Sequence, residues 1–83
     1  MYDFKEFVDL VYKTKDKALL EDFLLAITTS SERNTLARRI VIVRKLISGE
    51  AQKKIAKDLR VGVGTVSLGS KELKQGRFKI LQK

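Results

Sequence analysis

Apolar side chains recur at helical intervals along the first part of this 83-residue chain. Between Tyr2 and Lys13 they fall on one face with a period near 3.6, at Phe4, Phe7, Val8 and Val11. Residues 14–17 form a polar break. The next stretch, residues 18–27, is apolar almost all round, with only Glu21 and Asp22 polar. We therefore predict two N-terminal helices, and the second must be enclosed on most of its sides.

A longer helix is predicted from about residue 30 to about Ser48. The hydroxyl run at residues 28–31, followed by Glu32, is a helix-start signal, and either Thr29 or Ser30 can serve as the N-cap. One apolar stripe of this helix is Leu36, Ala37, Ile40, Val43 and Ile47, and a second is Ile42 and Leu46. Two stripes indicate two packing partners, one of them another subunit. Gly49 is expected to end the helix in the left-handed conformation.

Residues 50–74 have the pattern of a helix-turn-helix. Apolar positions at Ala51, Ile55, Ala56 and Leu59 define one face of a first short helix. Val61 and Gly62 interrupt the pattern, and it resumes at Val66, Leu68 and Leu73. Apolar anchors of this kind hold two helices at a wide angle, and the short side chains that open the second helix allow it to enter a major groove. This stretch predicts a DNA-binding corner.

The turn of this motif contains an unusual residue. Arg60 stands where such motifs commonly have Gly, in a position that tends to need a positive φ, at a cost of about 1 kcal/mol. Gly62 is a weak N-cap for the second helix. After the motif, Gly76 is expected to break the helix, and residues 75–83 form a short amphipathic tail that carries Phe78.

Length and composition indicate one domain, residues 1–83, which the pattern divides into four segments. They are N-terminal dimerisation helices at 1–28, a long central helix at 29–49, the helix-turn-helix at 50–74 and a tail at 75–83. Such a small chain without Cys or His lacks disulfides and most zinc chemistry, so it is expected to complete its core as a homodimer. No apolar run approaches the roughly 20 residues of a bilayer span, and no secretion signal is visible. We expect no membrane association and a cytoplasmic location.

The charge is uneven along the chain. Residues 1–30 carry four Lys and six acidic residues, whereas residues 31–83 carry fourteen Lys or Arg and four acidic residues, a balance of +10. The basic excess lies in the part that holds the helix-turn-helix. Double-stranded DNA is therefore the expected partner, although a solvated basic face is the alternative explanation of the charge.

The order of certain residues within 29–74 is distinctive. It comprises Leu36-x-x-Arg39, the helix end Gly49-Glu50, Gln52, and Thr65-x-x-x-Gly69-Ser70 before Leu73-Lys74. In these features the chain resembles the tryptophan repressor family, which usually has one more residue near Ala51. The resemblance implies an all-α, intertwined dimer of about five to six helices with a helix-turn-helix. It also implies a repressor that binds an operator under the control of an amino-acid corepressor.

The resemblance assigns an effector pocket to Thr29, Arg39 and Gly69, with Arg39 expected to pair with a ligand carboxylate. Two residues depart from the family pattern. Leu68 replaces an Arg that stacks on the corepressor's indole, and Glu72 replaces a Ser that helps to hold its amino group. Loss of the guanidinium removes a cation–π contact worth roughly 0.5–2 kcal/mol. We therefore expect tryptophan not to act as corepressor, and we predict no cofactor and no metal.

On the DNA-binding interpretation, each subunit reads one half-site of a palindrome, and half-sites lie about one helical turn apart. Val63, Gly64, Ser67 and Leu68 are expected at base edges, where Ser67 can donate to a base or to a phosphate. Gln52 and Lys53 are expected at phosphates, and Lys57 and Lys71 are expected to add non-specific attraction. Thr65 completes the predicted contact set. Because long base-reading side chains are scarce, water bridges and DNA shape are expected to supply specificity.

Two alternatives to DNA binding remain at this point. The helix-turn-helix can be a purely structural corner, or the chain can be a helical protein-interaction adaptor dimer whose basic face binds an acidic partner. An enzyme is not expected, since no acid–base pair or activated nucleophile stands out.

Overall fold

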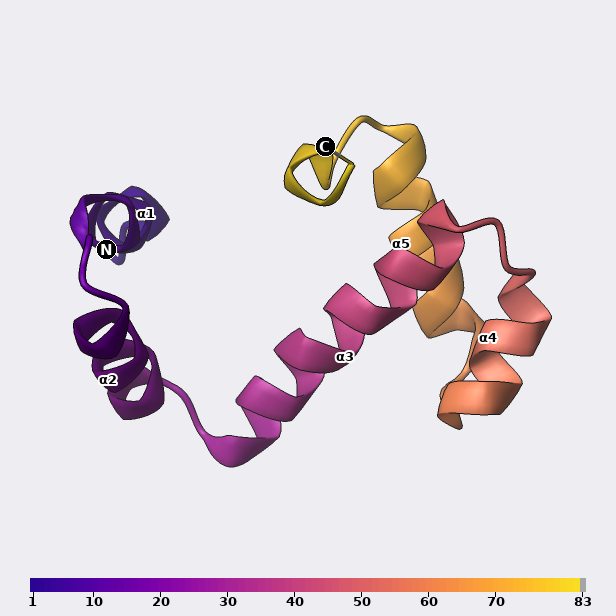
Figure 1. The fold of residues 1–83 in the computed structure, drawn as a ribbon, viewed down its shortest axis with the longest axis horizontal. Coiled ribbons are helices and arrows are strands. Elements are labelled where there is room, and N and C mark those ends of the chain that lie inside the picture. The colour runs from indigo at the N-terminus through magenta and orange to yellow at the C-terminus, as the bar shows by residue number, and fades with distance from the viewer. Residues whose placement is uncertain (83) are drawn as a thin grey trace. The chain divides into compact units, whose positions relative to one another are not determined.

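The computed structural model describes residues 1–82, and all regular secondary structure in this part of the chain is helical (Figure 1). Five α-helices are followed by one turn of 3-10 helix, in agreement with the predicted all-α class. The elements are α1 (Phe4–Lys13), α2 (Lys17–Ile27), α3 (Ser30–Ile47), α4 (Gln52–Leu59), α5 (Val63–Lys74) and η1 (Lys79–Leu81). Lys83, the last residue of the predicted tail, lies outside the described residues.

The chain forms two compact units, one of residues 1–33 and one that begins at Asn34. The first contains α1, α2 and the first turn of α3. The second contains the rest of α3 and the helix-turn-helix. Whether the two units form the single domain that we predicted stays a prediction, and each unit is described by itself.

The first three helices begin at residues whose side chains cap them. Asp3 accepts from the Lys5 amide at 2.9 Å, and Asp16 accepts from the Ala18 amide at 2.9 Å, which sets the starts of α1 and α2. At α3, Thr29 Oγ1 accepts from the Glu32 amide at 3.1 Å, while the Thr29 amide donates to Glu32 Oε1 at 2.8 Å. This capping box selects Thr29 rather than Ser30 as the N-cap.

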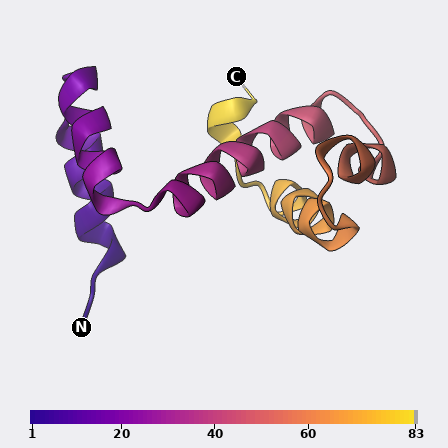
Figure 2. The same cartoon turned by 90° about the horizontal axis from the view of Figure 1, so that it is seen from below.

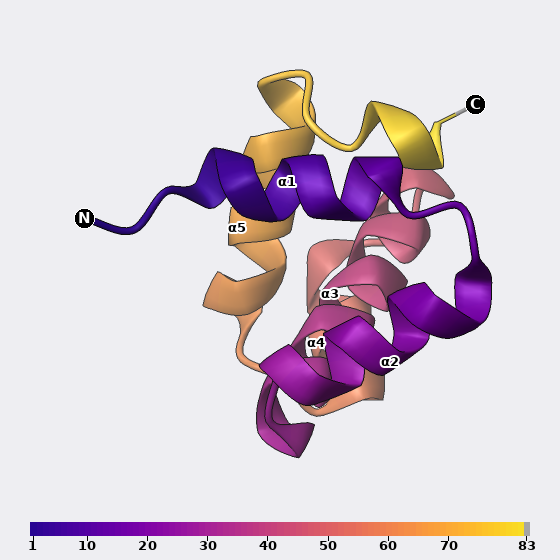
Figure 3. The same ribbon diagram turned by 90° about the vertical axis from the view of Figure 1, so that its left-hand side faces the viewer.

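The first unit buries little of its apolar surface. Figure 3 shows α1 and α2 joined by a short connection, residues 14–16. The Phe7 ring lies 5.9 Å from the Phe4 ring and 6.0 Å from the Phe23 ring, centroid to centroid. No side chain of α1 or α2 is fully buried. Phe4 and Leu19 are 74% and 63% exposed in the single chain, so the unit lacks a closed core of its own.

The second unit has a small, closed core. Ile42 of α3, Ile55 of α4 and Val66 of α5 are at most 2% exposed and lie in one cluster. Around them pack the partly buried side chains of Leu46, Ala56, Leu59 and Val61. One residue from each of the three helices therefore fixes the helix-turn-helix against the C-terminal half of α3.

Three helices end with a residue in the left-handed conformation: Gly49 after α3 (φ 92°), Arg60 after α4 (φ 56°) and Gly76 after α5 (φ 87°). After α3, the Gly49 amide donates to Leu46 and the Glu50 amide donates to Lys45, which is a Schellman motif. The predicted roles of Gly49 and Gly76 are confirmed. Arg60 adopts the same backbone conformation without the freedom of glycine, as its position in the turn predicted.

Candidate nucleic-acid interface

The helix-turn-helix consists of α4, a three-residue connection and α5, and Figure 2 shows the short turn that joins the two helices. At Arg60 the backbone has φ 56° and ψ 46°, and the Val61 amide donates to the Ala56 carbonyl at 3.0 Å. Ile55 and Val66 are fully buried between the helices. The left-handed residue turns the chain sharply, and the two apolar anchors hold the angle between α4 and α5.

The predicted DNA-binding residues lie on these two helices, and most of them are exposed to solvent. Lys53 and Lys57 lie on α4, while Val63, Gly64, Thr65, Ser67, Leu68 and Lys71 lie on α5; Gln52, the first residue of α4, is half-buried. Leu68 is 66% exposed. A Cβ added to Gly64 would meet no atom within 4 Å. The chain itself therefore leaves open space at the start of α5.

Both helices of this motif begin without a side-chain cap, unlike α1, α2 and α3. The N-cap residues are Ala51 for α4 and Gly62 for α5, and neither accepts a hydrogen bond through its side chain. The first amide groups of such a helix point outward without an intrahelical partner, and they carry the positive end of the helix dipole. This arrangement favours an anionic group, and a backbone phosphate is one.

One side-chain hydrogen bond joins the two helices at their exposed edge. Ser67 Oγ on α5 donates to Gln52 Oε1 on α4 at 2.8 Å. The sequence pattern indicated the two residues separately, Gln52 for a phosphate and Ser67 for a base or a phosphate. It carried no signal that the two side chains meet, because they are fifteen positions apart.

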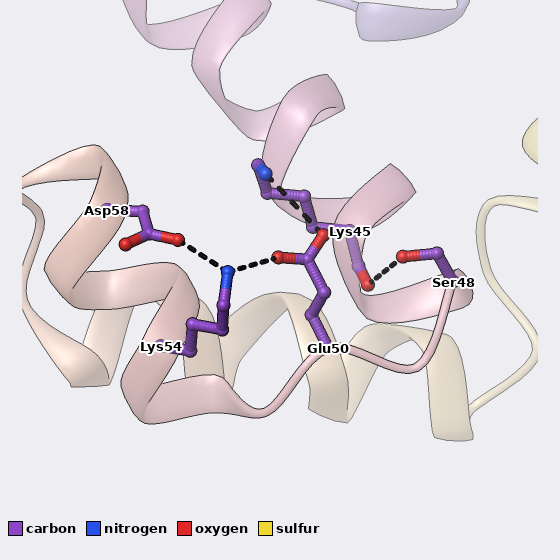
Figure 4. A network of polar contacts seen from close by, with 5 residues as sticks. All are labelled: Lys45, Ser48, Glu50, Lys54 and Asp58. Atoms are coloured by element: carbon purple, nitrogen blue, oxygen red, sulfur yellow. Dashed lines mark hydrogen bonds and ion pairs between the residues drawn. The ribbon is translucent and has the colours of Figure 1, made fainter.

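A chain of ion pairs connects the end of α3 to α4 (Figure 4). Glu50 lies 3.5 Å from Lys45 Nζ and 3.5 Å from Lys54 Nζ, and Lys54 lies 2.8 Å from Asp58. The hydrogen bond from Lys54 lowers the pKa of Asp58, and the same contact raises the pKa of Lys54. Lys54 is thereby engaged within the chain, whereas Lys53 and Lys57 have no partner among these ion pairs.

A pocket of about 400 Å³ lies between α3 and α5, within the second unit. Its lining residues are Thr35, Arg38, Arg39, Ile42, Val43, Thr65, Leu68, Gly69, Glu72 and Phe78. At Gly69 the helix α5 packs directly against α3, since a Cβ there would lie 3.4 Å from Leu46 Cδ1 and 3.6 Å from Ile42 Cγ2. The pocket combines two guanidinium groups, one carboxylate and an apolar wall.

The structure brings together two of the three predicted effector residues, Arg39 and Gly69. Thr29 is not among the lining residues; it caps α3 in the first unit. Sequence reasoning missed Thr35, Arg38 and Phe78 as pocket residues. Thr35 lies four residues before Arg39, and Arg38 lies four residues before Ile42, so this helical spacing could have predicted that they share a face of α3. Arg38 Nε is buried without a hydrogen-bond partner in the single chain.

Leu68 and Glu72, the two departures from the family pattern, both line this pocket. Leu68 was also predicted to contact bases, and Thr65 was assigned to the DNA-binding set. Their positions place both residues beside the pocket as well as on the exposed part of α5. The pocket and the predicted DNA-binding set therefore share residues of one helix.

Within residues 1–82, no helix combines the length and the apolar composition that are needed to cross a bilayer.

Comparisons with known proteins agree with this geometry. The family model of the Trp repressor protein matches residues 2–81. A Trp operon repressor homolog from Vibrio vulnificus is 38% identical over 73 residues, which are 87% of this chain and 72% of the relative. Homologs of the same name from Vibrio cholerae and Aliivibrio fischeri are 36% and 33% identical, over 87% of this chain and over 71% and 68% of their own lengths. The chain thus belongs to the Trp repressor family, a family of transcriptional repressors and not of enzymes.

Proposed function

We propose that this chain represses transcription by binding double-stranded DNA as a homodimer, with α5 of each subunit in the major groove of one half-site. The observation that carries the proposal is the corner of α4 and α5, where uncapped helix starts lie beside exposed small and basic residues. Family membership supports repression. The relatives are called Trp operon repressor homologs, and we infer the same class of DNA-binding activity here.

Charge supports the assignment of this corner to DNA. Lys53, Lys57 and Lys71 are exposed on α4 and α5. Each Lys that neutralises a phosphate releases counterions, so affinity depends steeply on salt. The free amides at the starts of both helices add donors that need no charged side chain. Val63 and Gly64, in the first turn of α5, are the expected base-edge residues.

The exposed apolar surface supports a homodimer. Leu25 and Ile27 of α2 are 51% and 53% exposed in the single chain, and Leu36 and Ile40 of α3 are 51% and 45% exposed. A first unit without any buried side chain on α1 or α2 leaves more apolar surface in water than a stable small domain tolerates. A second copy of the same chain is the partner that the family implies. A repressor acts on the chromosome, and we therefore propose a cytoplasmic location.

We further propose that tryptophan is not the corepressor. Leu68 stands in the pocket where a stacking guanidinium is expected, and Glu72 adds a carboxylate to the same wall. Arg39 remains available for a ligand carboxylate. The pocket therefore keeps the residue that would pair with a ligand carboxylate, Arg39, and lacks the guanidinium that would stack on an indole.

The decisive experiment is a titration of duplex DNA against the purified protein at several salt concentrations. The duplexes are those that the protein itself selects from a random-sequence pool, so the operator does not have to be identified first. We expect palindromic selected sites and affinity that falls steeply as salt rises. The absence of affinity for any duplex at about 50 mM salt would instead favour a protein-interaction adaptor. Sedimentation of a stable 9.5 kDa species would contradict the homodimer.

A further inference from the structure

The hydrogen bond between Ser67 and Gln52 links two residues that the sequence pattern predicted as separate DNA contacts, and it assigns them different roles. Ser67 Oγ lies 2.8 Å from Gln52 Oε1 and donates its single O–H to that atom. A serine hydroxyl has one donor, and here this donor is already engaged within the chain. Ser67 therefore has no donor left for a thymine or guanine acceptor while the pair is intact.

Gln52 keeps most of the hydrogen-bonding capacity of its side-chain amide. Its amide nitrogen has two N–H donors, and its carbonyl oxygen has a second lone pair. As the first residue of α4, Gln52 lies beside the amides of a helix start that has no side-chain cap. Phosphate oxygens are acceptors only, so the free donors of the Gln52 amide match them. The carbonyl, which already accepts from Ser67, is turned toward α5.

We infer that Ser67 is a positioning residue, which holds the Gln52 amide in the orientation that donates to a DNA phosphate. The inference rests on the proposed DNA-binding function and refines it. A free glutamine side chain samples several rotamers and loses that freedom on binding. Ser67 restricts the Gln52 side chain in the free protein, so the side chain loses less conformational entropy when DNA binds. The two residues then act as one unit across the corner.

A double-mutant cycle with Ser67→Ala and Gln52→Ala tests the inference on duplexes that the unmodified protein has selected. We expect Ser67→Ala to weaken binding by about three- to tenfold, the effect of losing one hydrogen bond. In the Gln52→Ala background the same change should have almost no effect. Because neither residue is charged, the salt dependence of binding should keep its slope.

Two further variants distinguish a role of Ser67 in positioning Gln52 from a role in the stability of the protein. Ser67→Thr keeps the hydroxyl and should restore most of the affinity. Ser48→Ala removes a hydroxyl that also makes a 2.8 Å hydrogen bond, to the Lys45 carbonyl, but at the end of α3. It should leave DNA affinity unchanged. Thermal unfolding of all variants shows whether any loss of affinity follows a loss of folded protein.

The inference fails if Ser67→Ala and Gln52→Ala act independently, or if Ser67→Thr binds as weakly as Ser67→Ala. Independent effects would mean that Ser67 contacts DNA by itself. This result differs from a failure of the proposed function, in which the unmodified protein binds no duplex at all.

Discussion

Gly69 and Leu46 set how closely α5 approaches α3. A Cβ placed on Gly69 would lie 3.4 Å from Leu46 Cδ1, at the inner edge of ordinary van der Waals contact. The helices are therefore spaced for a residue no larger than alanine at this point. Gly69 also lines the pocket, together with Arg39 and Glu72.

Residue size at position 69 should decide stability. Gly69→Ala should be tolerated, and the better helix propensity of alanine can add up to about 1 kcal/mol. Gly69→Leu should lower the free energy of unfolding by about 1–3 kcal/mol, because the larger side chain must displace Leu46 and Ile42. Urea unfolding of both variants measures the difference. Equal stabilities would show that the α3–α5 contact is not close in solution.

Gly64 should be required for DNA binding but not for folding. Nothing lies within 4 Å of an added Cβ there, so Gly64→Ala should stabilise α5 by about 0.5–1 kcal/mol. Gly64→Glu places bulk and negative charge at the surface that we propose faces the base edges of the DNA, and it should abolish binding. Gel-shift titration and sedimentation together test this. A Gly64→Glu variant that loses the dimer would contradict the assignment of this residue to the DNA surface alone.

The left-handed conformation of Arg60 is a source of strain that can be removed. Arg60→Gly should raise the free energy of unfolding by about 1 kcal/mol, since glycine adopts φ 56° without a Cβ clash. Arg60→Ala is the matched control, because it removes the same side chain and keeps the strain. Thermal unfolding should rank the glycine variant above the alanine variant. The opposite ranking would argue against strain at this turn.

The capping box of α3 should make helix stability depend on acid pH. The hydrogen bond from the Thr29 amide lowers the pKa of Glu32 from its ordinary value of 4.5. A group with a lowered folded pKa stabilises the folded state above its ordinary pKa, and this contribution is lost as the pH falls through the folded value. Stability should therefore fall below about pH 4.5.

Glu32→Gln supplies the control for this pH effect. Glutamine can still accept from the Thr29 amide but does not titrate. The difference in thermal midpoint between the unmodified chain and Glu32→Gln should shrink or reverse as the pH is lowered from 7 to 3. A difference that stays constant over this range would show that Glu32 makes no titratable contribution. Asp58 is present in both proteins, so its contribution to the pH dependence cancels when their thermal midpoints are compared.

Two substitutions should raise the affinity of the pocket for tryptophan. Leu68→Arg reintroduces a guanidinium for stacking, worth roughly 0.5–2 kcal/mol, and Glu72→Ser removes a carboxylate from the same wall. The double variant should therefore bind tryptophan at least several-fold more tightly than the unmodified chain. Isothermal calorimetry measures the tryptophan affinity of the double variant and of the unmodified chain. A micromolar heat signal from the unmodified chain would contradict our view of Leu68.

Much of the architecture could be predicted from local pattern. The period of apolar residues located five helices, and their ends agree with the structure to within two residues. The glycines that follow α3 and α5 and the left-handed Arg60 were also predictable, because helix ends depend on backbone sterics within a few residues. For α3, only the side-chain geometry distinguished Thr29 from Ser30 as the cap.

The sequence by itself therefore determined the helices and their ends. It also determined that the half of the chain with the helix-turn-helix is basic. Each of these features depends on residues that are neighbours along the chain. Tertiary structure decided which distant side chains meet. It placed Ser67 against Gln52, and it grouped Arg38 and Phe78 with Arg39, Leu68 and Glu72 around one pocket. These pairings depend on the angles at which α3, α4 and α5 pack, and those angles follow from the joint burial of Ile42, Ile55 and Val66. No local pattern specifies such an angle, because it is a property of three helices packed together.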